Sequence, residues 1–171
     1  MSRSVLVAYA TRHGATAGIA SRVAAALTAA GLPAEARPVE DVKDVEPYEA
    51  VVIGGAAYMF HWLRPAVTFA RRHRKELAAR PVWVFSSGPL GTELVDKDGK
   101  NVLEATRPKE FDELTKLLHP RGEQVFFGAR PLLLLSGSAQ VRQWAQAHGP
   151  DRWRPSALTS CSSRSSCSSY V

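Results

Sequence analysis

Short apolar runs alternate along this chain with segments whose apolar residues recur at helical spacing. Continuous apolar runs occupy residues 5–9, 50–54, 82–85 and 125–127, and each is too short for an amphipathic helix. Runs of this kind are typical of strands that are buried on both faces of a parallel sheet. Residues 34–38 alternate small apolar and charged residues and include a proline, which predicts an edge strand.

Three segments between these runs have the spacing of helices that cover a sheet. They are residues 16–30, 64–79 and 108–118. The first ends before Gly31, a common stop signal. In the second, His73 lies on the apolar stripe, and the cations beside it spread over the remaining, solvated surface.

Repetition of strand, helix and strand at intervals of about thirty residues predicts an α/β fold with a parallel sheet. Right-handed crossovers leave few topologies open. A first strand at the centre of five fits the doubly wound order 2-1-3-4-5. We therefore expect residues 1–128 to form one domain around a five-stranded parallel sheet.

The chain changes character after residue 128. Residues 129–171 contain no Lys, Glu, Ile or Phe, and Ser accounts for 8 of the last 16 residues. We expect an atypical, partly disordered tail in place of the helix that this fold needs after its fifth strand. Two origins of the tail remain open, an extension peculiar to this lineage and a shifted reading frame.

Composition restricts the classes of function. The net charge of +6 comes mostly from the tail, since residues 1–128 carry 17 basic and 15 acidic residues. A nucleic-acid-binding protein needs a basic face on its folded part, so we expect no nucleic-acid partner. Both cysteines, Cys161 and Cys167, lie in the tail, which leaves the body without thiol chemistry.

Two further classes of site are not expected. No run reaches the about 18 apolar residues of a membrane span and no signal peptide is seen, so the cytoplasm is the expected compartment.

Asp96-Lys97-Asp98-Gly99 begins like a calcium-binding loop but lacks the later ligands and the closing Glu. We interpret it as a polar turn and expect no metal site.

The turn between the first strand and the first helix carries the candidate chemistry. It reads YATRHGAT from Tyr9 to Thr16. It lies at the carboxyl end of a central strand, beside the point where doubly wound sheets bind ligands. The helix start supplies unpaired N–H groups, Thr11 and Thr16 add hydroxyls, and Gly14 permits close approach of the backbone. These features suit a phosphate group.

Alternative explanations exist for each of these residues. Helix capping alone would account for either threonine, but both of them with Gly14 between favour the phosphate site. His13 is either a phosphate contact or a solvated turn residue. The segment lacks the Gly-Lys-Ser/Thr of a nucleotide P-loop and the G-x-G-x-x-G of a dinucleotide site.

The pattern Thr-x-x-Gly-x-Thr resembles the phosphate loop of the flavodoxin family, [Ser/Thr]-x-Thr-Gly-x-Thr, with His13 where the family has Thr. Residues 55–62 are aromatic-rich and residues 86–91 are small and contain glycine, as in the two loops with which flavodoxins hold their flavin. The resemblance covers about residues 4–128. It is strongest to the flavodoxin-domain proteins that include the menaquinone-dependent protoporphyrinogen dehydrogenases, which also carry an insertion comparable to residues 87–107.

This resemblance implies a flavodoxin-like fold that binds FMN non-covalently. The implied cofactor-binding residues come from three loops: Thr11, Arg12, His13, Gly14, Ala15 and Thr16 from the first, Ala57, Tyr58 and Trp62 from the second, and Ser87, Gly88 and Gly91 from the third. Tyr58 and Trp62 either stack on the flavin or cover apolar surface. The choice among Tyr58, Phe60 and Trp62 for the ring contact stays open.

The resemblance also implies electron transfer or oxidoreduction with a redox partner or a small-molecule substrate. Oxidation of a porphyrinogen with a quinone as acceptor is the specific activity that it implies. The alternative is a degenerate binding domain of the same fold, without flavin or catalysis.

Overall fold

A computed structural model describes residues 4–90 and 93–128 of the chain. The predicted tail, residues 129–171, lies outside the described residues, as does Gly91 of the predicted site.

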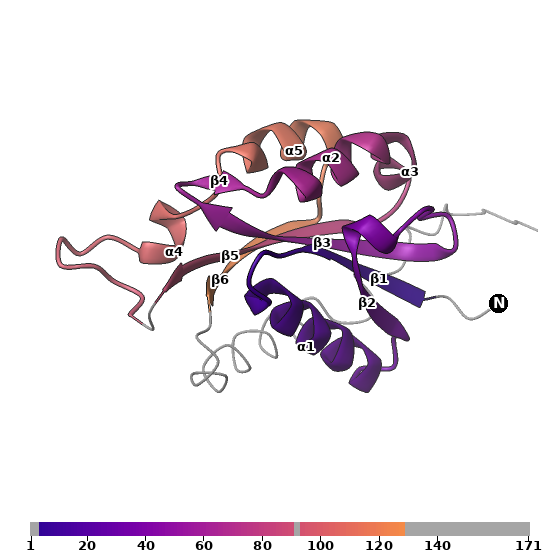
Figure 1. Cartoon of the computed structure of the whole chain (residues 1–171), viewed down its shortest axis with the longest axis horizontal. Helices are drawn as coiled ribbons and strands as arrows, with labels where there is room; N and C mark the ends of the chain where they lie inside the picture. The colour runs from indigo at the N-terminus through magenta and orange to yellow at the C-terminus, as the bar shows by residue number, and fades with distance from the viewer. Residues whose placement is uncertain (1–3, 91–92, 129–171) are drawn as a thin grey trace, which may run out of the picture.

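The described chain folds around one parallel sheet with helices on both faces (Figure 1). The order of the parallel strands is β2-β1-β3-β5-β6, which confirms the predicted doubly wound order. A two-residue strand, β4, pairs antiparallel with the end of β3 and forms a hairpin that the sequence did not predict. The strands are β1 (Ser4–Ala10), β2 (Ala34–Pro38), β3 (Tyr48–Tyr58), β4 (His61–Trp62), β5 (Val82–Leu90) and β6 (Gly122–Gly128).

Strand β3 extends four residues beyond the apolar run that predicts it, from Gly55 to Tyr58. A Cβ atom on Gly54 would lie 2.1 Å from the ring of Phe85, and one on Gly55 would lie 2.6 Å from Nε1 of Trp62. Glycine is therefore required at both positions of the strand, because the aromatic side chains occupy the space where a larger residue would place its own side chain.

Helix α1 covers one face of the sheet, and α2, α3 and α5 cover the other (Figure 1). A short 3-10 helix, η1, and a single helical turn, α4, lie in the connections. The helical segments are α1 (Ala15–Ala29), η1 (Val39–Asp41), α2 (Arg64–Arg72), α3 (Arg74–Ala78), α4 (Val102–Ala105) and α5 (Glu110–Leu118).

The sheet has a separate hydrophobic core on each face. Val7 and Val52 point toward α1, whereas Leu6 and Val51 point toward the opposite layer, which includes Phe111 of α5. This alternation explains why the central strands β1, β3 and β5 contain continuous apolar runs, since both of their faces are buried. Each fully buried aliphatic or aromatic side chain contributes about 1.5–3 kcal/mol relative to exposure.

The predicted helix over residues 64–79 is divided in two at His73, where φ is −98° and ψ is 20°. The imidazole is 6% exposed and its ring centroid lies 4.9 Å from that of Phe69. Its Nε2 atom has no hydrogen-bond partner among the described residues. Burial lowers the pKa of His73 and the charge of Arg72 adds to this effect, while Glu76 and Asp44 oppose it.

We expect His73 to make folding stability depend on pH. Because its folded-state pKa lies below the unfolded value of about 6.5, the unfolded chain takes up a proton first as the pH falls. The contribution of His73 to the free energy of unfolding is therefore fully present above about pH 6.5. Below that pH the free energy of unfolding falls by at most about 1.4 kcal/mol per pH unit. Urea unfolding at pH 8 and pH 5.5 should show this loss in the wild type, and His73→Leu should remove it.

An exposed histidine supplies the control for this experiment. His119 has φ 47°, a conformation that Asn tolerates, so His119→Asn should keep the pH dependence of the wild type. An unchanged pH dependence in His73→Leu would contradict the assignment to His73.

Candidate functional site

Gly14 begins helix α1 and lies in the left-handed region, with φ 83° and ψ −12°. Its N–H donates to Oγ1 of Thr11 at 3.0 Å, and its carbonyl accepts from the N–H of Gly18. A side chain on Gly14 would meet no atom within 4 Å, so glycine is needed here for its backbone conformation.

Thr16 lies in the first turn of α1 and is fully buried. Its Oγ1 hydrogen-bonds with Oγ of Ser87 at 2.8 Å, across 71 residues of sequence. The bond joins the β1–α1 turn to the end of β5, two of the three segments predicted to form the site. Helix α1 has no side-chain cap. Thr11 instead holds the turn by accepting the N–H of Gly14, and the hydroxyl of Thr16 is bonded to Ser87.

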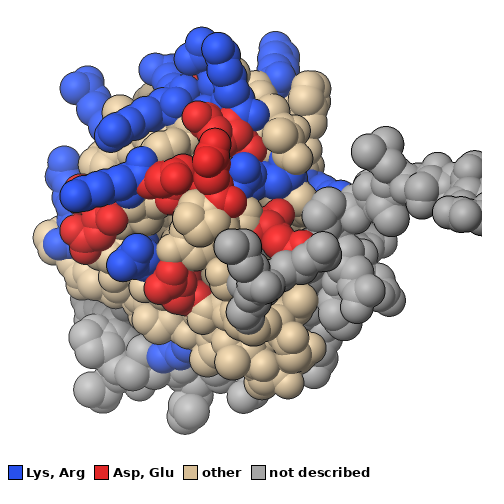
Figure 2. Space-filling view, turned by 90° about the vertical axis from the view of Figure 1, so that its right-hand side faces the viewer, with Lys and Arg blue, Asp and Glu red and all other residues tan. Residues whose placement is uncertain are grey.

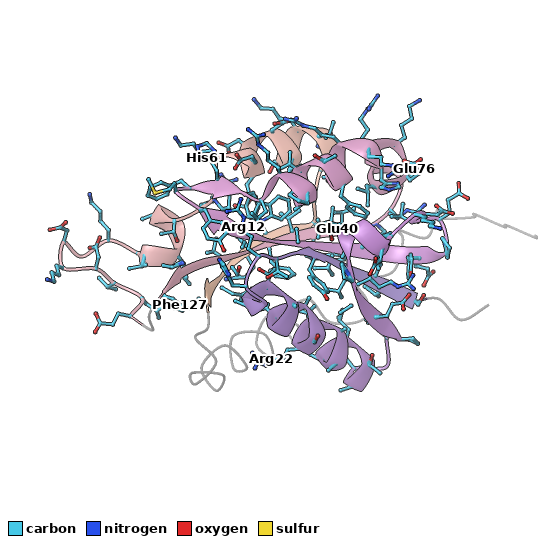
Figure 3. The ribbon with its side chains drawn as sticks, in the orientation of Figure 1. Arg12, Arg22, Glu40, His61, Glu76 and Phe127 are labelled. Atoms are coloured by element: carbon cyan, nitrogen blue, oxygen red, sulfur yellow. The ribbon has the colours of Figure 1, made fainter. Side chains whose placement is uncertain are left out.

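The hairpin of β3 and β4 reaches the same turn through Tyr58. The guanidinium carbon of Arg12 lies 5.5 Å from the centroid of the Tyr58 ring. The ring of His13 meets that of Tyr58 edge-on, with centroids 6.5 Å apart. Figure 3 shows Arg12 and His61 in the half of the molecule that holds this hairpin, with Glu76 at the opposite end. Tyr58 is 40% exposed and thus presents an aromatic ring beside the turn.

Met59 and Phe60 form the tip of the hairpin, and both have positive φ, 51° and 64°. A two-residue turn of this kind suits the twist of antiparallel strands, but Asn and Gly are its usual residues. Such a conformation costs a bulky residue about 1–3 kcal/mol. The two side chains are 86% and 50% exposed, so they are presented to solvent at the expense of backbone strain.

Glu110, at the start of α5, fixes the hairpin in place through contacts with strand β4. One carboxylate oxygen lies 2.8 Å from Nδ1 of His61, and the other accepts the N–H of Trp62 at 2.9 Å. The N–H of Lys109 also donates to the carbonyl of Phe60 at 3.0 Å. Burial opposes ionisation of Glu110, but the bonds from Trp62 and His61 outweigh it and lower the pKa of Glu110.

Trp62 is placed differently from the predicted flavin contact. Its indole is 3% exposed, donates from Nε1 to the carbonyl of Gly55 at 2.9 Å, and packs edge-on against Phe111. Of the two roles that the sequence left open, the structure shows the covering of apolar surface. Ala57, the residue paired with Trp62 across the hairpin, is half-buried.

The third predicted segment contributes packing as well as Ser87. A Cβ atom on Gly88 would lie 2.9 Å from Cγ1 of Val125, so this glycine permits close approach of β5 and β6. Ala15 is half-buried at the start of α1. Ser86, which precedes Ser87 on β5, is fully buried, and its hydroxyl has no hydrogen-bond partner in the described part of the chain.

The loop around Asp96 is the polar turn that the sequence predicts. Oδ1 of Asp96 accepts the N–H groups of Asp98 and Lys100, and Gly99 has φ 76°. Within residues 4–90 and 93–128, no group of three or more His, Cys, Asp or Glu side chains is placed to hold a metal ion. No helix in these ranges has the length and apolarity needed to cross a membrane.

The buried hydroxyl pair predicts non-additive effects on stability. Thr16→Val keeps the shape of the side chain but leaves the Ser87 hydroxyl without its partner, which should cost about 1–3 kcal/mol. Ser87→Ala should act similarly on Thr16. The double variant should lose less stability than the sum of the two single variants, as measured by urea unfolding. Strict additivity would show that the two hydroxyls do not interact.

The clamp at Glu110 predicts local opening of the hairpin. Glu110→Ala removes the acceptor of the Trp62 N–H and should raise the hydrogen-exchange rate of this amide, with a loss of about 1–3 kcal/mol in stability. Glu110→Gln keeps one acceptor oxygen and should have a smaller effect. Because the folded-state pKa of Glu110 is lowered, its contribution is present at neutral pH and is lost in acid as the pH falls through that pKa.

Glu113 provides a control on the same helix. It pairs with Arg71 at the exposed surface, so Glu113→Ala should cost no more than about 1 kcal/mol and leave Trp62 exchange unchanged. Equal exchange rates at Trp62 in all of these variants would contradict the clamp.

Comparison with solved structures shows the same fold. An archaeal flavodoxin superposes with a TM-score of 0.58 at 14% identity, over 84% of this chain and 97% of that one. The two-electron-reduced flavodoxin of Megasphaera elsdenii gives a TM-score of 0.56 at 19% identity, over 82% and 99%. The rubredoxin oxygen:oxidoreductase of Desulfovibrio gigas gives 0.61 at 11% identity, and this chain covers 35% of its length.

Sequence comparison identifies the family. No curated protein matches the chain. A family model described as the flavodoxin domain matches residues 6–130, which contain all the residues predicted to bind FMN. The proteins of this family bind FMN, in agreement with the cofactor predicted from the phosphate-loop motif. The chain belongs to the flavodoxin-domain family.

Proposed function

We propose that the protein binds FMN at the carboxyl ends of β1, β3 and β5 and uses it in electron transfer or oxidoreduction. The observation that carries the proposal is the junction of the predicted loops: Thr16 bonds to Ser87, and Tyr58 packs beside Arg12 and His13. Ligands of doubly wound folds bind at this edge of the sheet.

The β1–α1 turn fits a phosphate group. The open space beside Gly14 admits a ligand to the backbone, and the start of α1 offers unpaired N–H groups with the positive end of the helix dipole. The first turn of α1 contains no acidic residue that would repel an anion. Arg12 and His13 are exposed there, so a phosphate would meet a basic side chain in addition to the backbone donors.

For the contact with the flavin ring we propose Tyr58, because Trp62 is buried. Tyr58, unlike the similarly exposed Phe60, lies against Arg12 and His13 of the β1–α1 turn. Bound FMN supplies the exchange of one or two electrons, while the protein supplies its position and electrostatic surroundings. Tyr58 would hold one face of the ring, and the Thr16–Ser87 bond would keep the phosphate and ring subsites at a fixed separation.

FMN titration tests the proposal. The wild type should quench flavin fluorescence saturably, and Gly14→Asp should lose this binding because a carboxylate would stand at the phosphate position. Gly31→Asp is the matched control: Gly31 also has positive φ (85°) and open space around it, but it follows the far end of α1. This variant should bind FMN like the wild type.

Two outcomes would contradict the flavin site. A folded wild-type protein that does not bind FMN would favour the degenerate domain. Equal loss of binding in Gly14→Asp and Gly31→Asp would attribute the effect to backbone strain, and not to the phosphate subsite.

Within oxidoreduction, the proposed substrate is a porphyrinogen and the proposed acceptor a quinone, with the cytoplasm as compartment. This narrower proposal is supported by the resemblance of the chain and by the long segment between β5 and α5, where Leu94 and Val95 are each 53% exposed. Oxidation of protoporphyrinogen by the FMN-loaded protein should require an added quinone. Turnover no faster than in a Gly14→Asp control would contradict it.

A further inference from the structure

His61 on β4 forms a hydrogen bond with a carboxylate from another part of the fold. Its Nδ1 atom lies 2.8 Å from one oxygen of Glu110, and the other oxygen accepts the N–H of Trp62 at 2.9 Å. The second bond fixes the carboxylate, and the carboxylate in turn fixes the orientation of the imidazole. Three other histidines lie in the described part of the chain, and none of them is hydrogen-bonded to a carboxylate there: His13, His73 and His119.

This hydrogen bond determines which nitrogen of His61 is available for chemistry. Burial opposes ionisation of Glu110, but the bonds from Trp62 and His61 lower its pKa, so the carboxylate is ionised and only accepts hydrogen bonds. Nδ1 therefore carries the hydrogen, and Nε2 has a free lone pair. No residue in the ranges 4–90 and 93–128 hydrogen-bonds with Nε2, and the side chain is 59% exposed. Nε2 can thus take a proton from a bound molecule.

His61 lies beside the position proposed for the flavin ring. It is directly opposite Tyr58 in the antiparallel pair of β3 and β4, and the Cβ atoms of such pairs are about 4.5–5.5 Å apart on the same face. Tyr58 is the residue proposed to contact the ring. Figure 3 shows His61 in the same half of the molecule as Arg12 of the β1–α1 turn. A substrate that reaches the ring at this edge would therefore also reach Nε2.

Attachment of the hairpin to α5 does not by itself explain the bond to His61. The N–H bond of Trp62 to Glu110 and the bond from Lys109 to the carbonyl of Phe60 already make that attachment. An exposed ion pair adds little stability. A histidine with one nitrogen oriented by a carboxylate and the other accessible is a recurrent proton-transfer unit of enzymes.

We propose that His61, oriented by Glu110, transfers a proton in the reaction at the flavin. The inference rests on the proposed FMN function and adds that the reaction is a two-electron oxidation coupled to the loss of a proton. An exchange of single electrons would need no such group. His61 is the catalytic residue, because Nε2 would touch the substrate, and Glu110 is a positioning residue that acts through it.

The step balances for the porphyrinogen and quinone proposed above. In the porphyrinogen, a C–H bond of a methylene bridge and a pyrrole N–H bond break, and the conjugated system gains one double bond. The C–H hydrogen leaves with its electron pair for the bound flavin, and the N–H proton passes to Nε2 of His61. One oxygen of the quinone then receives that hydrogen with its electron pair, and the other receives the proton from His61, which yields a quinol.

Two stopped-flow reactions of the FMN-loaded full chain test this proposal. The first is reduction by protoporphyrinogen without oxygen, and the second is oxidation of the photoreduced protein by menadione, a quinone. His61 must be unprotonated to take a proton and protonated to return it. The first rate should therefore rise, and the second should fall, between about pH 5.5 and 8.

His61→Asn removes Nε2 but keeps an N–H that can bond to Glu110 in place of Nδ1. It should bind FMN like the wild type, lower both rates about 100-fold and abolish both pH dependences. The other charged or titratable groups around the hairpin remain in this variant, so a lost pH dependence identifies His61. They are Tyr58 on β3, Arg64 at the start of α2, Lys109 and Glu110 at the start of α5, and Arg12 and His13 in the β1–α1 turn.

His119→Asn is the matched control. His119 follows α5 and precedes β6, so it lies toward the amino ends of the strands. Figure 2 shows this end of the molecule, where Asp and Glu side chains lie among Lys and Arg side chains. The same substitution there should leave both rates and both pH dependences as in the wild type.

Nuclear magnetic resonance of the imidazole nitrogens supplies a readout that needs no turnover. In the unaltered chain at pH 8, His61 should carry its hydrogen on Nδ1. Glu110→Ala should move that hydrogen toward Nε2 and slow the reaction with menadione. Imidazole added to His61→Ala should restore part of the lost rate, which it would not do if His61 only stabilised the hairpin.

The results separate this proposal from the proposed function. Failure of the unaltered chain to bind FMN would overturn both. Normal FMN binding with wild-type rates in His61→Asn, or a hydrogen on Nε2 in the unaltered chain at pH 8, would overturn only proton transfer by His61. Reaction with menadione but not with protoporphyrinogen would overturn the porphyrinogen, and the menadione rate would then decide the role of His61. Reaction with neither would overturn proton transfer as well.

Discussion

The left-handed conformation of Gly14 fixes the direction in which the chain leaves β1 and enters α1. The turn that follows from it places Thr16 in the interior, where its hydroxyl meets Ser87. It also leaves Arg12 and His13 on the surface beside Tyr58. A side chain with a steric penalty at this φ would move all of these groups, so one backbone conformation organises the candidate site.

The hairpin shows how strain at the site is compensated elsewhere in the fold. Positive φ at Met59 and Phe60 costs about 1–3 kcal/mol each. Glu110 accepts the N–H of Trp62 and pairs with the exposed His61 on the strand that follows the tip, and removal of its carboxylate is expected to cost about 1–3 kcal/mol. The clamp and the buried indole of Trp62 together are of the size needed to hold the turn. The consequence is an exposed aromatic and apolar edge at the place where a flavin ring is proposed to lie.

Features that depend on local pattern were predictable from the sequence, and those that depend on long-range contact were not. The apolar runs identified four of the five parallel strands because a strand buried on both faces has few polar positions, and the alternating pattern of residues 34–38 identified the edge strand β2. The hairpin was missed because Met59-Phe60 carries no turn signal and Gly54-Gly55 resembles the end of a strand. Glu110 was missed for a similar reason: nothing near it in sequence shows that its partners are His61 and Trp62. Trp62 could be placed in an aromatic-rich loop, but its direction into the core depends on Gly55 and Phe111.

Membership of the flavodoxin-domain family and the geometry of the β1–α1 turn lead to one central claim, that this turn holds the phosphate of FMN. Nuclear magnetic resonance of ¹⁵N-labelled protein tests it most directly, by comparing FMN with riboflavin, which lacks the phosphate. The account predicts that FMN shifts the backbone amide resonances of residues 12–16 and that riboflavin leaves them largely unchanged. Identical shifts with both ligands, or shifts with FMN that spare residues 12–16, would contradict it.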